Sequence, residues 1–68
     1  MSPSLAEIQE RVYVLRLRRA HLWSWYGLRG ERRELFLSGL WRQATEATGA
    51  ERAAAIAALE DIGRVLQA

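Results

Sequence analysis

The side chains with the greatest capacity for chemistry or binding are concentrated between residues 16 and 33, in the sequence RLRRAHLWSWYGLRGERR. This stretch holds the only histidine, His21, with six arginines, two tryptophans and a single acid, Glu31. Guanidinium groups bind carboxylates and phosphates, and Trp, Tyr and Arg dominate the binding energy of protein interfaces. The stretch therefore indicates binding of a macromolecule.

Catalysis is not expected from these side chains. A nucleophile needs an adjacent base, and the base needs an orienting partner, but the chain has one histidine, no cysteine and no serine in a triad-like context. Glu60 and Asp61 are neighbours that diverge by about 100° on a helix. One histidine with scattered acids supplies no zinc ligand set. We predict a non-enzymatic protein with no catalytic residues, no metal site and no cofactor, in which His21 is half-buried.

A first helix is predicted over residues 4–26, because Ser4 and Glu7 have capping-box spacing and Pro3 is tolerated in a first turn. One apolar stripe recurs at helical spacing, and we expect it to pack on the core: Leu5, Ile8, Val12, Leu15, Leu22 and Tyr26. Arg19 falls inside this stripe. Its guanidinium either pairs with Glu34, Glu46 or another subunit, or lies at the bundle rim with its head in water, which we favour.

A second apolar face follows the opposite side of this helix, and its members are Val14, Leu17, His21, Trp25 and Leu28. A helix that is apolar on two sides is usually enclosed on both. Two further short helices cover only one side. We therefore expect the second face to form an interface, as the core of a dimer or as the site of a foreign partner.

Two more helices are predicted, over residues 31–47 and 49–67. Gly27 to Gly30 forms a turn in which Gly27 takes the left-handed conformation. Thr48 and Glu51 have capping-box spacing, which favours a break at Gly49 over one continuous helix from 31 to 67. The alanines of the last segment either let another helix approach closely or reflect high helix propensity, and both interpretations stay open.

The fold class that follows is all-α: a small antiparallel bundle of three helices in a single domain covering residues 1–68. A core in a chain of 68 residues rarely supplies more than a few kcal/mol, and disulfides are excluded, so we expect self-association as a homodimer. The sequence contains neither a signal-peptide pattern nor an apolar run of membrane-spanning length. We expect a soluble, cytoplasmic protein.

The predicted function is that of a regulator, inhibitor or adaptor that binds a protein partner with an acidic or grooved surface. The first helix and the following turn supply the expected partner-binding residues: Leu17, Arg18, His21, Trp25, Leu28, Arg29, Arg32 and Arg33.

The alternative is a small nucleic-acid-binding regulator that places Arg16, Arg18, Arg29, Arg32 and Arg33 on phosphates. The formal net charge of +2 is low for a dedicated nucleic-acid binder, and acids flank the basic stretch. Glu7 and Glu10 also argue against a role for the first helix at a membrane surface.

Overall fold

The computed structural model describes residues 2–68, which form three helices: α1 (Leu5–Gly27), α2 (Glu31–Glu46) and α3 (Gly49–Gln67). No strand occurs in this range. The all-α prediction is confirmed, and each predicted helix boundary lies within one residue of the observed one. The break between α2 and α3 rules out the continuous helix.

The helix ends show which sequence signals operate. Ser4 caps α1, because its Oγ accepts a hydrogen bond from the backbone N–H of Glu7 at 3.2 Å. The left-handed conformation predicted for Gly27 is instead found at Gly30, the N-cap of α2, with φ 57°. Gly49 also has a positive φ, of 59°. Thr48 is the N-cap of α3 but makes no capping hydrogen bond with its side chain. The positive φ of Gly49, and not a hydrogen bond from the Thr48 hydroxyl, therefore marks the break between α2 and α3.

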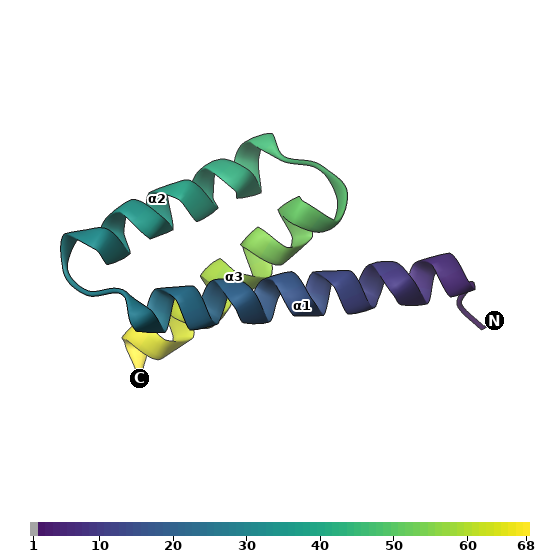
Figure 1. Ribbon diagram of the computed structural model, residues 1–68, viewed down its shortest axis with the longest axis horizontal. Helices are drawn as coiled ribbons and strands as arrows, with labels where there is room; N and C mark the ends of the chain where they lie inside the picture. The colour runs from purple at the N-terminus through teal and green to yellow at the C-terminus, as the bar shows by residue number, and fades with distance from the viewer. Residues whose placement is uncertain (1) are drawn as a thin grey trace.

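α3 is the central helix, since it packs against both α1 and α2, whereas α1 and α2 contact each other much less. In Figure 1, α1 is the long horizontal helix, α2 returns above it in the opposite direction and α3 crosses behind it. The N-terminal turns of α1 extend past the other two helices, which gives the molecule its elongated shape of 45 × 25 × 18 Å.

The core is built from large side chains of α1 and α2 set against alanines of α3. Its buried cluster consists of Trp25, Leu40, Ala55, Ala58 and Ile62. Ala54, Ala55 and Ala58 are completely buried. Alanine adds little bulk, and Trp25 belongs to the same buried cluster as Ala55 and Ala58. The burial of Ala54 and Ala58 favours the close-approach interpretation at these two positions, whereas Ala53 is exposed.

The face of α1 that packs on this core is the opposite of the predicted one, except that the predicted core residue Leu22 is half-buried and does pack against it. Trp25, expected in an interface, is 2% exposed, while Leu5 and Leu15, expected in the core, are 71% and 58% exposed. Two physical differences favour the observed choice. The buried face contains His21, which can be packed as a neutral imidazole, whereas the other face contains Arg19, whose permanent charge is costly to bury.

Candidate functional site

An exposed apolar face runs along α1 on the side turned away from α3. We call it the outer stripe and define it by its exposed apolar members: Leu5, Ile8, Val12, Leu15, Trp23 and Tyr26. A helical period of about 3.6 residues places these side chains in a band along one side of the 23-residue helix. Contiguous apolar surface of this kind on a soluble protein typically marks an interaction site.

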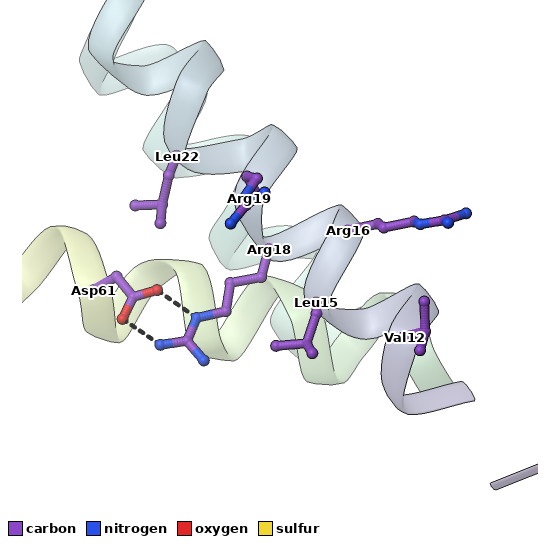
Figure 2. Close-up of a pocket in the computed structure, with 7 residues that line it drawn as sticks. All are labelled: Val12, Leu15, Arg16, Arg18, Arg19, Leu22 and Asp61. Atoms are coloured by element: carbon purple, nitrogen blue, oxygen red, sulfur yellow. Dashed lines mark hydrogen bonds and ion pairs between the residues drawn. The ribbon is translucent and has the colours of Figure 1, made fainter. Parts of the chain in front are cut away.

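Arginines border the outer stripe. Arg11, Arg16 and Arg19 are exposed, and none of them takes part in an ion pair within residues 2–68. Figure 2 shows Arg16 extending away from Asp61 and from α3. At about 100° per residue, the outer stripe and these arginines occupy an arc of about 140° that holds no acidic residue. The face is therefore mainly apolar, with Arg11 and Arg16 at its edges and Arg19 in its middle, and the position of Arg19 within the stripe is the one that the sequence predicted.

Arg18, one of the predicted partner-binding residues, is instead held by α3. Its Nε and Nη2 donate to the two carboxylate oxygens of Asp61 at 2.5 and 2.7 Å (Figure 2). Arg64 Nη2 donates to the same carboxylate at 2.7 Å. These hydrogen bonds, that of Arg18 first, lower the pKa of Asp61 to about 2, and the bond to Asp61 raises the pKa of Arg18. The arrangement fixes how α1 is rotated against α3.

An open groove of about 580 Å³ lies between this ion pair and the outer stripe. It is lined by Val12, Leu15, Arg16, Arg18, Arg19, Leu22 and Asp61. Figure 2 shows that all of these except Asp61 come from α1. The groove therefore continues the outer stripe toward α3 and does not form a separate enclosed cavity.

The remaining predicted residues of the second face lie inside the protein. Leu17 and Leu28 are half-buried and Trp25 is fully buried. His21 is half-buried, as expected, with its ring edge-on to Phe36 at 6.2 Å between centroids, and desolvation lowers its pKa, which favours the neutral imidazole. This face packs within the protein and leaves Trp25 inaccessible to a partner. Binding of a partner by the half-buried residues Leu17, His21 and Leu28 stays a prediction.

The three arginines at the turn between α1 and α2 differ in whether they make contacts within the protein. Arg33 caps the C-terminus of α1: its Nε donates to the carbonyls of Leu28 at 2.6 Å and Trp25 at 3.2 Å, and its guanidinium lies 4.0 Å from the centre of the Trp25 ring. Arg29 and Arg32 are exposed. Of the eight predicted partner-binding residues, these two alone are fully accessible.

Sequence reasoning assigned the outer stripe, apart from Trp23, to the core and gave Arg11 no role. A signal for the opposite assignment was present in Arg19, whose permanent charge falls in the middle of that stripe. Burial penalises a guanidinium far more than the imidazole of His21, which occupies the other face. Weighing these two residues against each other favours the observed orientation of α1.

Comparisons with protein-family models, with curated proteins and with solved structures give no match to this chain. Across residues 2–68, no helix is long and apolar enough to cross a membrane. The same range contains no group of three or more His, Cys, Asp or Glu residues arranged to hold a metal ion. Inference about function therefore depends on the exposed surface of α1.

Proposed function

We propose that this protein is a non-enzymatic helical interaction module, acting as a regulator, inhibitor or adaptor, which binds a protein partner through the outer stripe of α1. One observation carries the proposal. Four aliphatic side chains, Leu5, Ile8, Val12 and Leu15, are exposed on one side of a helix whose other side is already packed on α3. Transferring such side chains from water into an interface contributes about 25 cal/mol per Å² of apolar area buried.

The shape of α1 favours a partner that supplies a helix or a groove. The N-terminal turns of α1 extend past the rest of the protein as a ridge (Figure 1). An amphipathic helix is recognised through side chains spaced three and four residues apart, which enter a partner's groove together. Trp23 and Tyr26 lengthen the same face and are 72% and 50% exposed. Aromatic residues of this kind are frequent anchors of interfaces.

Nucleic acid fits the surface less well. Two of the five arginines suggested for phosphate contacts are engaged within the protein, because Arg18 pairs with Asp61 and Arg33 caps α1. Apart from Arg19, the centre of the exposed face is aliphatic, and aliphatic side chains neutralise no phosphate charge. These observations favour a protein partner over the alternative function.

The test is site-specific photo-crosslinking in native cell extract, with a photoreactive amino acid in place of Ile8. We expect a crosslink to a protein that persists after nuclease treatment and disappears when Leu15→Glu is added. Leu35→Glu, the same change at a leucine on α2 that is 66% exposed, is the matched control and should leave the crosslink unchanged. Both variants should unfold within about 0.5 kcal/mol of the parent, since both sites face solvent.

Two results would overturn the proposal. The first is a crosslink that is equally strong with Leu15→Glu, because the aliphatic stripe would then have no part in binding. The second is nuclease-sensitive capture together with duplex or single-strand affinity that falls steeply with salt and does not depend on Leu15. The second result would establish the nucleic-acid function instead.

A further inference from the structure

The outer stripe has the residue spacing of a coiled-coil seam. Two sets of positions alternate three and four residues apart over three heptads: Leu5, Val12, Arg19 and Tyr26 in one set, and Ile8, Leu15 and Leu22 in the other. In a coiled coil these are the a and d positions, which interdigitate with a facing helix. The structure leaves most of them exposed. α1 therefore presents a seam without its partner helix.

The charges beside this seam are all of one sign. Arg11 and Arg18 occupy g positions and Arg16 an e position, and neither kind of position holds an acid. The e and g residues of a coiled coil select the partner through ion pairs with its flanking residues. An a position occupied by a charged residue, here Arg19, fixes the register of the pairing, because its charge must meet a counter-charge.

On this basis we infer that the occupant of the outer stripe is an acidic amphipathic helix of about three heptads, with glutamates beside its apolar seam and one acid facing Arg19. The inference rests on the proposed function and names its partner. The guanidinium groups of Arg11, Arg16 and Arg19 are exposed and have no acid paired with them in residues 2–68, so an acidic helix supplies the complementary charge.

Asp61 lines the groove next to Leu15 and Leu22, but it does not oppose such a partner. Its carboxylate already accepts hydrogen bonds from Arg18 and from Arg64.

Two further acids, Glu7 and Glu10, line a pocket with Arg11 and Leu15. They occupy c and f positions of the heptad, outside the e and g positions that flank the seam. The charged residues at those flanking positions are all arginines, which favours a partner with negatively charged side chains.

A second copy of this chain fits the face poorly. In an antiparallel pair centred between Val12 and Leu15, g positions of one copy face g positions of the other, so Arg11 comes next to the second copy's Arg18. Arg19 then enters the aliphatic seam next to Ile8. In a parallel pair, the two Arg19 side chains face each other. Like charges placed opposite one another destabilise a helix pair, and neither arrangement provides a carboxylate.

The probe is a synthetic three-heptad peptide with leucine at its seam, glutamate at its flanking positions and one seam glutamate opposite Arg19. Its own glutamates repel one another, which keeps the free peptide from pairing with itself at neutral pH. A second peptide has glutamine in place of every glutamate. Anisotropy of the labelled peptides is measured at about 0.1 M and about 1 M salt, where the Debye length falls from about 10 to about 3 Å.

We expect the glutamate peptide to bind at least about tenfold more tightly than the glutamine peptide at low salt, and this advantage to shrink at high salt. Arg19→Glu should lose about tenfold in affinity for the glutamate peptide and regain it when the facing glutamate is replaced by arginine. Arg42→Glu makes the same charge change on α2, at a residue whose pair with Glu46 is exposed and 3.9 Å long. This control should bind like the parent.

The outcomes separate the two proposals. If Leu15→Glu abolishes binding of both peptides but the parent shows no preference for glutamate, the inference of an acidic partner is overturned and the proposed function stands. If Leu15→Glu changes nothing, the proposed function itself is overturned. Absence of binding by the glutamate peptide, or a dimer in sedimentation that Leu15→Glu dissociates, also overturns the inference. The dimer would show that the occupant is a second copy.

Discussion

Arg18 and Asp61 connect α1 to α3 through two parallel hydrogen bonds, from Nε to Oδ2 at 2.5 Å and from Nη2 to Oδ1 at 2.7 Å. The two residues are 43 positions apart in the sequence. Such two-pronged contact between a guanidinium and a carboxylate is highly directional. It fixes the rotation of α1 about its axis, with Trp25 turned inward and Leu15 turned toward solvent.

Acid should weaken this connection within a defined range of pH. The pKa of Asp61 is about 2 in the folded protein against an ordinary value of 3.8, so the unfolded chain takes up the proton first as the pH falls. The stabilisation is therefore complete above about pH 4 and is lost progressively toward about pH 2. Urea midpoints measured across this range should fall less steeply for Asp61→Asn than for the parent. Parallel curves would contradict the prediction.

The two tryptophans of α1 should differ sharply in their effect on stability. Trp25→Ala removes a buried side chain and should cost about 3–5 kcal/mol, which is enough to unfold much of a small domain. Trp23→Ala, at a site that is 72% exposed, should change the free energy of unfolding by no more than about 0.5 kcal/mol. Thermal unfolding followed by circular dichroism checks both. The reverse order would mean that the outer stripe, and not the Trp25 face, forms the core.

Trp25→Phe should destabilise the protein less than Trp25→Ala does. The indole Nε1 of Trp25 is buried and has no hydrogen-bond partner among the described residues, so the change to phenylalanine breaks no hydrogen bond and removes an unsatisfied donor. The remaining loss is that of packed volume, which is smaller for phenylalanine than for alanine. Equal destabilisation by the two variants would show that the indole N–H does contribute.

Arginines stabilise both junctions between helices by the same means. Arg33 donates to carbonyls at the end of α1, and Arg52 donates to the carbonyl of Ala44 at 3.0 Å near the end of α2. We expect Arg33→Ala to cost about 1–2 kcal/mol, and Arg33→Lys to recover only part of it, because an ammonium lacks the planar fork of donors. Chemical denaturation measures the loss. Arg32→Ala, an exposed neighbour, should have little effect.

Two glycines should respond to alanine with opposite signs. Gly30 has φ 57° and ψ −134°, a conformation that strains residues with a Cβ, so Gly30→Ala should destabilise by about 1–3 kcal/mol. Gly39 is helical, and a Cβ added there meets no atom within 4 Å. Gly39→Ala should therefore stabilise by about 0.5–1 kcal/mol. Melting temperatures that move in the same direction for both variants would contradict this assignment.

The sequence by itself determined the helices and where they end. Helix boundaries depend on neighbours in the chain: Ser4 caps α1 with its own hydroxyl, and Gly30 and Gly49 supply backbone conformations that other residues rarely adopt. The two apolar faces of α1 were also visible, because helical periodicity is a local property. The three-helix organisation was predictable for the same reason.

The tertiary structure decided which face of α1 is buried, and Arg19 was the one signal for that choice in the sequence. Periodicity shows that both faces are apolar but does not rank them, since the choice depends on the surface that α3 provides. That surface includes Ala55 and Ala58, which share a buried cluster with the indole of Trp25, and Asp61, which accepts hydrogen bonds from Arg18. The residues of α3 that make these contacts lie far from α1 in the sequence. They turn Trp25 into a core residue and leave Leu5, Ile8, Val12 and Leu15 in solvent, where the candidate binding site lies.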